Sequence, residues 1–177
     1  MTQPDLLPAK QGHLDGLCGI YSIVNALNWL YGNNIRRRSL FRYLLEQYHQ
    51  HWSVLECITD GICEIEMDYL LNTARRYNTK TKAINISMPF RYRRSLSSYR
   101  ILQSCQQFLE APTGKQAIIL CDQHHWSVIT QVTDTQVRYF DSCELQMIPR
   151  DKFMIKAHAR RTQLIPSAIY WLNSDIE

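Results

Sequence analysis

One cysteine of the chain stands where a protein could use it as a nucleophile. In QGHLDGLCGIYSIVNAL, residues 11–27, Cys18 lies between Gly16 and Gly19 and is followed by apolar residues at helical spacing. Gly16 allows a sharp turn before the cysteine, and Gly19 leaves space beside it. The first N–H groups of a helix have no intrahelical partner and stabilise a thiolate there. We therefore expect a reactive Cys18; the alternative is a small apolar residue packed at a helix start.

A histidine and an aspartate later in the chain could serve such a nucleophile. His125, in DQHHWSVITQ, directly precedes a strand-like alternation that begins at Trp126. His124, one residue earlier, would point to the other face. Asp141, in YFDSCE, follows the next predicted strand, sixteen residues after His125. An imidazole base needs such a third group to fix its tautomer and orientation, so the three residues could perform acyl transfer.

The segment that carries Cys18 belongs to a part of the chain that we expect to be mainly helical. Apolar residues recur at helical spacing in four segments before Gly114. Gly32 suits the C-cap of the first segment, and Ser39 suits the N-cap of the second. The predicted helices cover residues 17–31, 39–49, 64–77 and 98–109.

After Gly114 the pattern changes to short apolar runs between polar turns, which is typical of strands. These runs are QAIILC, HWSVITQV, VRYF and SAIYWL, and a further short strand is expected at residues 83–86. The turn TDTQ predicts a hairpin that pairs residues 126–132 with 137–140 in antiparallel fashion. The expected class is α+β, with an antiparallel sheet that carries His125 and Asp141.

Composition favours a single compact domain over residues 1–177. Hydrophobic residues make up 45% of the chain, which is enough for a sizeable core. No apolar run approaches the roughly 18 residues that cross a bilayer, and the N-terminal segment lacks the pattern of a signal peptide. We expect a cytoplasmic protein without membrane contact, or one exported by a route that leaves no such signal.

The cysteines do not indicate a disulfide framework or a metal centre. Six of them are spread without repeated spacing, so reduced thiols are expected. A mixed group formed by His49, His51, Cys57 and Cys63 matches a zinc site only weakly. We expect neither a metal nor a cofactor.

The positive charge gathers in two arginine runs. The net charge is +4, with one run at Arg36 to Arg38 and another at Arg91, Arg93 and Arg94. Recognisable nucleic-acid-binding modules are absent, so no nucleic-acid partner is expected. We predict instead that these arginines meet the acidic surface of a protein substrate, because complementary charge speeds encounter.

The order of these motifs resembles the papain-like cysteine peptidase superfamily. QGHLDGLCGIYSIVNAL, HHWSVI and RYFDSC are most similar to its compact bacterial members, the C39-like peptidases and the related glutamine deamidases. The resemblance implies a helical N-terminal half with the nucleophile helix, followed by the sheet. It also implies Cys18 as nucleophile, His125 as general base and then acid, and Asp141 as orienting group. Gln11 would donate a side-chain N–H to the oxyanion, with the Cys18 backbone N–H as second donor.

Two departures point to a pared-down relative rather than a lysosomal-type protease. The chain has L-C-G-I-Y in place of C-G-S-C-W, and His125 follows Cys18 at a shorter spacing than in papain. The implied reaction forms a thioester on Cys18 from a protein or peptide substrate. The enzyme is a protease if a peptide nitrogen leaves, and a protein-glutamine deamidase if ammonia leaves. A third alternative, of another class, is a catalytically silent protein-binding module.

Overall fold

A six-stranded antiparallel sheet forms the centre of the computed structural model, which describes residues 6–77, 84–112 and 114–174. The strand order is β1-β8-β2-β3-β4-β5. These strands are β1 (Ile84–Ser87), β2 (Gln116–Cys121), β3 (Trp126–Val132), β4 (Gln136–Tyr139), β5 (Met147–Pro149) and β8 (Ile169–Ser174). Two short strands, β6 (Phe153–Met154) and β7 (Thr162–Gln163), pair in parallel beside it.

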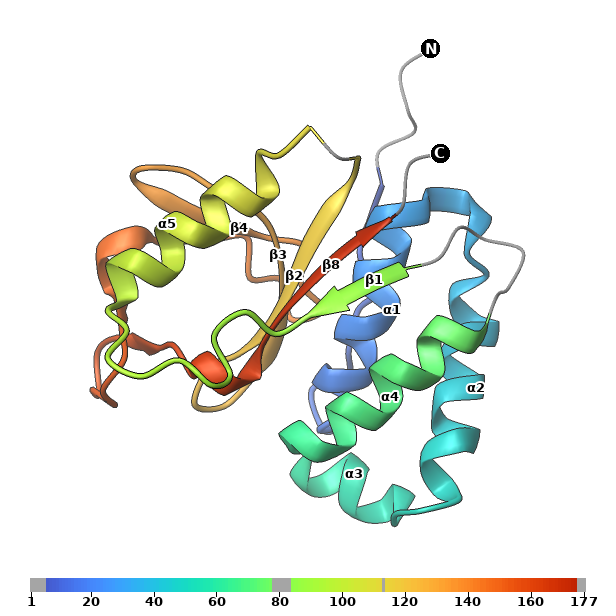
Figure 1. The fold of residues 1–177 in the computed structure, drawn as a ribbon. Coiled ribbons are helices and arrows are strands. Elements are labelled where there is room, and N and C mark those ends of the chain that lie inside the picture. The colour runs from blue at the N-terminus through green and yellow to red at the C-terminus, as the bar shows by residue number, and fades with distance from the viewer. Residues whose placement is uncertain (1–5, 78–83, 113, 175–177) are drawn as a thin grey trace.

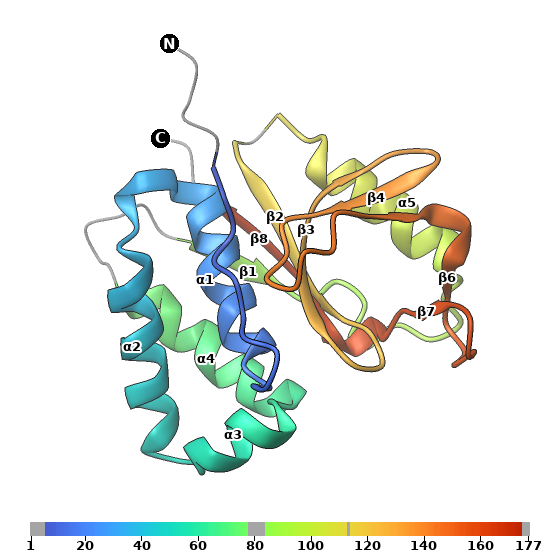
Figure 2. The same cartoon turned by 180° about the vertical axis from the view of Figure 1, so that it is seen from behind.

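Helices cover both faces of this sheet, which confirms the α+β class (Figures 1 and 2). They are α1 (Cys18–Tyr31), α2 (Arg37–His49), α3 (Val54–Asp60), α4 (Glu64–Tyr77) and α5 (Ser98–Leu109). Helix α1 packs on one face, with α2 and α4 behind it, while α5 lies on the other face. None of the described helices is long and apolar enough to span a membrane.

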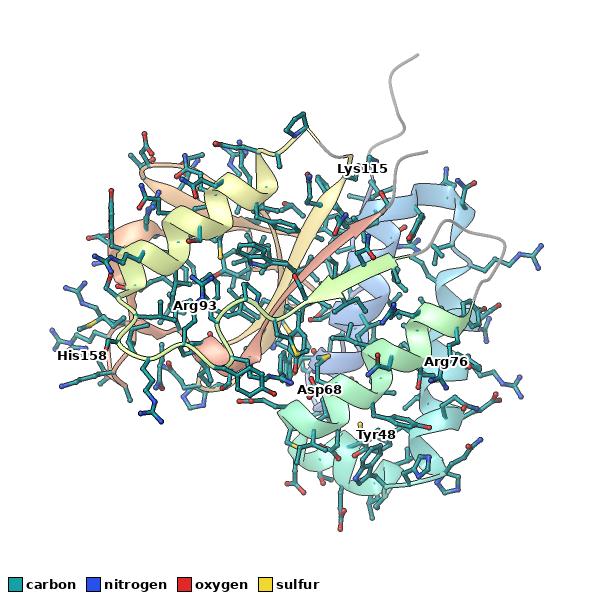
Figure 3. All side chains as sticks on the ribbon, viewed as in Figure 1. Tyr48, Asp68, Arg76, Arg93, Lys115 and His158 are labelled. Atoms are coloured by element: carbon teal, nitrogen blue, oxygen red, sulfur yellow. The ribbon has the colours of Figure 1, made fainter. Side chains whose placement is uncertain are left out.

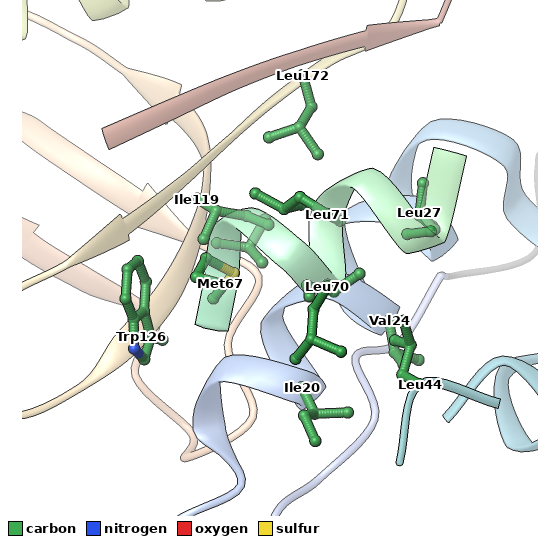
Figure 4. Packing of buried hydrophobic residues seen from close by; sticks show 14 of the residues in the cluster. Ile20, Val24, Leu27, Leu44, Met67, Leu70, Leu71, Ile119, Trp126 and Leu172 are labelled. Atoms are coloured by element: carbon green, nitrogen blue, oxygen red, sulfur yellow. The ribbon is translucent and has the colours of Figure 1, made fainter. Parts of the chain in front are cut away.

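Helix α1 is buried because it lies between the sheet and two other helices. Its residues Ile20, Val24 and Leu27 are almost completely inaccessible to solvent. They pack among side chains of α2, α4 and the strands, as Figure 4 shows. Each such aliphatic side chain contributes about 1.5–3 kcal/mol when fully buried. The nucleophile candidate therefore begins a helix that the core holds in place.

Helix α5 precedes β2 in the chain, as predicted, but packs apart from the other helices. Its Ile101 and Leu102 pack against Ile118 and Leu120 of β2, on the face of the sheet opposite α1. Ile119, between those two, points to the α1 side. Strand β2 is thus buried on both faces, which explains its continuous apolar run.

Most predicted elements are confirmed, and the differences are local. The helices at 64–77 and 98–109 have the predicted bounds, and Gly32 caps α1 with a φ of 59°. The Ser39 prediction is wrong, because α2 begins at Arg37 and Ser39 lies inside the helix. Helix α3, which the sequence reading missed, has Ser53 as its N-cap. The expected strand at 83–86 is Ile84–Ser87; Ala83 lies outside the described residues.

Candidate active site

Cys18 is the first residue of α1 and lies just below the surface, with 7% of its area exposed. Asp15 stabilises the turn before the helix, because its Oδ1 accepts the Leu17 N–H at 3.1 Å. Within the described residues, no group accepts a hydrogen bond from the Cys18 backbone N–H. That N–H is therefore free to bind an oxygen of a ligand.

Both glycines near Cys18 are required by the loop between α3 and α4. A Cβ on Gly16 would lie 2.7 Å from the Gly61 nitrogen, and one on Gly19 would lie 2.5 Å from two Ile62 side-chain carbons. Gly16 also donates its N–H to the Ile58 carbonyl oxygen. The space beside Cys18 that the sequence suggested is thus filled by Ile62.

His125 is held by the turn before β3. Asp122 Oδ1 accepts the backbone N–H groups of His124 and His125, both at 2.8 Å. The next residue, Trp126, donates its indole N–H to the Ile62 carbonyl oxygen at 2.9 Å. His124 is exposed, whereas His125 is half-buried. The Trp126 contact fixes the start of β3 against the same loop that packs on the start of α1.

Strands β3 and β4 form the predicted hairpin with one irregularity. Val132 pairs with Val137 at the turn, and Ile129 pairs with Tyr139 nearer the other end. The register shifts between Ile129 and Gln131, so β3 holds one additional residue over this stretch. Because side chains alternate along a strand, this bulge changes which residues share a face of the sheet.

The paired strands bring the segments that follow and precede them close together. The pairing continues one residue past β4, since the Phe140 N–H donates to the Val128 carbonyl oxygen at 2.9 Å. His125, just before β3, and Asp141, just after β4, therefore lie at the same end of the hairpin.

The structure brings Cys18, His125 and Asp141 together. His125 Nε2 lies 3.1 Å from Asp141 Oδ2 and 3.2 Å from Oδ1. A carboxylate only accepts hydrogen bonds, so Nε2 carries a proton and Nδ1 is left for Cys18. Burial lowers the pKa of His125. The hydrogen bonds and charges of Asp141 and Cys18 have a larger effect in the opposite direction, so the pKa of His125 is raised to about 10. The ring is therefore held as a proton carrier between the thiol and the carboxylate.

Asp141 itself is well fixed for this role. Its side chain has no exposed area, and its Oδ1 accepts the Cys143 backbone N–H at 2.7 Å. A buried carboxylate is costly unless it is paired and hydrogen-bonded. The Cys143 amide and the His125 ring supply both conditions.

Gln11 joins the loop that carries Asp141 to the loop that precedes Cys18. Its backbone N–H donates to the Ser142 carbonyl oxygen at 3.1 Å, and its Oε1 accepts from Ser142 Oγ at 3.3 Å. Its Nε2 donates to the Asp15 carbonyl oxygen. Among the described residues, Gln11 makes no hydrogen bond to Cys18 or His125.

A hollow of about 340 Å³ opens next to this loop. Its lining residues are Lys10, Gln11, Gly12, His13, Asp15, Ser142, Cys143 and Glu144. A larger hollow of about 670 Å³ lies between α5 and residues 150–153. Neither of these two hollows is lined by Cys18, His125 or Asp141, but the smaller one is lined by Cys143, whose backbone N–H binds Asp141.

The other five cysteines lie outside the cluster of Cys18, His125 and Asp141 or at its border. All six thiols are unpaired, as expected from their spacing. Burial raises the pKa of Cys57 to about 11 and those of Cys105 and Cys121 to about 12. Cys63 and Cys143 are exposed.

The weak zinc match in the helical half does not form a site. His51 packs against the rings of Trp52 and Tyr69, and Cys57 is fully buried. Within the described part of the chain, His49, His51, Cys57 and Cys63 do not bring their ligand atoms together.

Arg91 corrects the predicted basic surface. Its guanidinium binds both oxygens of Asp68, at 2.6 and 2.8 Å, and also the Tyr170 hydroxyl at 2.8 Å. Figure 3 labels Asp68 on α4. Only 14% of its side chain is exposed. Arg93 and Arg94 remain exposed, so the surface available to an acidic partner is smaller than predicted.

The sequence reading missed the residues that support the cluster. Asp122 fixes the backbone of His125, and Asp15 fixes the loop before Cys18. Both had a signal in the sequence, because an aspartate two or three residues before a turn position commonly accepts backbone N–H groups.

No protein-family model matches the chain, and no curated protein matches it.

Proposed function

We propose that the protein is a cysteine-dependent amide hydrolase with a papain-like fold, acting on a protein or peptide substrate. One observation carries the proposal: the ring of His125 is bonded to buried Asp141 through Nε2 and interacts with Cys18 at the start of a helix. Nucleophile, base and orienting group in this relation are the requirements of nucleophilic amide hydrolysis. The order of the three motifs in the chain supports the same reading.

The reaction would proceed through a thioester. The Cys18 thiol gives its proton to His125 Nδ1, and its sulfur attacks the carbonyl carbon. The amide C–N bond then breaks as His125 passes that proton to the leaving nitrogen. Water then attacks the thioester; His125 takes a proton from that water and returns it to the departing sulfur. Asp141 keeps Nε2 protonated throughout, so that only Nδ1 exchanges protons with the substrate.

Two groups could stabilise the oxyanion that forms on the carbonyl oxygen. The Cys18 backbone N–H has no partner within the described residues. Gln11 donates one amide N–H to Asp15, and its second N–H would serve as the other donor. Each well-placed donor of this kind is worth about 2.7–4 kcal/mol in the transition state.

A comparison of wild type with Cys18→Ala on a cell extract tests the proposal. Mass spectrometry would map new protein N-termini, which a peptidase creates, and glutamine-to-glutamate conversions, which a deamidase creates. Either set of products, present with wild type and absent with Cys18→Ala, supports the hydrolase and decides between the two reactions. If wild type and variant give the same products on native and unfolded substrates, the residues serve a binding module.

A further inference from the structure

Cys143 adds a third metal-binding side chain to His125 and Asp141. A ring nitrogen of His125, a carboxylate oxygen of Asp141 and the Cys143 sulfur all lie within 4.8 Å of one another. Zinc binds such atoms at about 2.0–2.3 Å in a tetrahedron, which puts the ligand atoms roughly 3.3–3.6 Å apart. The 3.1 Å between His125 Nε2 and Asp141 Oδ2 is close to that spacing. Cys143 is exposed, so a rotamer change can bring its sulfur nearer.

We propose that His125, Asp141 and Cys143 form an inhibitory site for zinc, a regulation that rests on the hydrolase proposed above. Thiolate and imidazole ligands select zinc over magnesium or calcium. The negative charges of Asp141 and the Cys143 thiolate balance the charge of the cation, so the site gains no unpaired charge.

The surroundings of His125, Asp141 and Cys143 give a metal ion a path from solvent and an additional oxygen ligand. Cys143 forms part of the wall of the 340 Å³ hollow, through which an ion can approach. Gln11 Oε1 lies 3.5 Å from the Cys143 sulfur and, with solvent, is at hand for the fourth position. Three protein ligands with an open fourth position are typical of zinc sites that are not purely structural.

Metal binding would remove His125 from the reaction. Zinc takes the Nε2 lone pair after that nitrogen releases its proton to solvent, and Cys143 releases a second proton as it becomes a thiolate ligand. The ring then has its metal on Nε2 and its remaining proton on Nδ1. It can no longer accept a proton from water, and Asp141 is no longer available to orient it.

Cobalt, which substitutes for zinc and reports thiolate ligands by absorption, tests the site without any substrate. The Cys18→Ala protein is used, because zinc or cobalt could otherwise bind the Cys18 and His125 pair directly. We expect a thiolate-to-cobalt charge-transfer band in Cys18→Ala and in Cys18→Ala with Cys63→Ser, which removes another exposed cysteine. The band should disappear in Cys18→Ala with Cys143→Ser. A band of equal strength in that last variant overturns the proposal.

Zinc protection of Cys18 from alkylation tests the inhibition. Zinc should slow iodoacetamide labelling of Cys18 in wild type and Cys63→Ser, and Cys143→Ser should need at least about 10-fold more zinc for the same effect. Equal protection in Cys143→Ser would place the metal on the Cys18 and His125 pair and contradict the proposal. A cobalt band without any hydrolase activity would leave the metal site in place and reject the proposed function.

Discussion

Both carboxylate oxygens of Asp141 lie within hydrogen-bonding distance of His125 Nε2, at 3.1 and 3.2 Å. The same carboxylate receives the Cys143 backbone N–H, so it cannot turn away from the ring without breaking a second bond. The Cys143 N–H holds the Asp141 carboxylate in place, and the carboxylate in turn keeps the proton on Nε2 of His125. The tautomer of His125 follows from this relationship.

Replacing Asp141 with Asn should lower the pKa of His125. The carboxylate raises that pKa by hydrogen bonding and by charge, against the lowering effect of burial. We expect the NMR titration of the His125 ring, in metal-free protein, to give a pKa raised to about 10 in wild type and a clearly lower pKa in Asp141→Asn. Glu144→Gln removes a nearby exposed charge that has no contact with the ring, and should change the titration little. Equal shifts in both variants would contradict the assigned hydrogen bond.

The same pKa gives a sign to the pH dependence of stability. The folded-state pKa of His125 is raised above the unfolded value of about 6.5. Its contribution is therefore complete below about pH 6.5 and is lost as the pH rises toward about 10. Urea unfolding between these pH values should show a smaller loss of stability in Asp141→Asn than in wild type. A loss of the same size in both proteins would show that the pair does not stabilise the folded state.

Gly19→Ala should disturb the start of α1 through Ile62. The new Cβ would lie 2.5 Å from Ile62 carbons, and overpacking of this kind costs about 1–3 kcal/mol. Adding Ile62→Ala should recover part of the rate of Cys18 alkylation that Gly19→Ala loses, because it restores the space. Failure of the double variant to recover any of it would mean that Ile62 is not the obstacle.

Arg91→Ser should destabilise the fold, whereas Arg93→Ser should not. Arg91 joins Asp68 of α4 to Tyr170 of β8, and losing charged hydrogen bonds costs about 1.5–3 kcal/mol each. Arg93 is exposed, and its replacement should stay within about 0.5 kcal/mol. Urea unfolding at neutral pH compares the two. Equal stability of both variants would remove the structural role of Arg91.

Arg93 and Arg94 are exposed, so a double variant can test whether they meet an acidic surface of the substrate. Replacing both with Ser should lower the second-order rate on the natural substrate and weaken its salt dependence, because exposed charge acts on encounter and is screened by salt. Alkylation of Cys18 in the same variant should be unchanged. An unchanged rate at low salt would mean that these arginines do not meet the substrate.

The elements could be predicted from the sequence where one face of each element is buried. Apolar periodicity gave the bounds of α4 and α5, and the continuous run in β2 reflected a strand buried on both faces. The N-cap predicted at Ser39 was wrong because cap preference reflects only the local sequence. The start of α2 at Arg37 depends on packing against other segments, which the local sequence does not contain.

The three residues of the cluster could be chosen from their types and order, but their geometry could not. It depends on contacts that form only in the folded chain, such as those of Asp122 with the His125 N–H and of Asp141 with the Cys143 N–H. Arg91 was assigned to the surface because its partner Asp68 lies 23 residues away in the chain. Contacts between distant segments of this kind are set by the tertiary fold alone.

Iodoacetamide labelling at about pH 6, with the labelled cysteines identified by mass spectrometry, tests the central claim most directly. Cys18 is 7% exposed, whereas Cys63 is exposed at the surface, so accessibility alone would favour Cys63. The claim predicts that Cys18 reacts at least about 10-fold faster than Cys63, and that His125→Ala abolishes this advantage while Cys63 is unaffected. If Cys18 reacts no faster than Cys63 in the wild-type protein, Cys18 is an ordinary buried thiol and the nucleophile assignment is wrong.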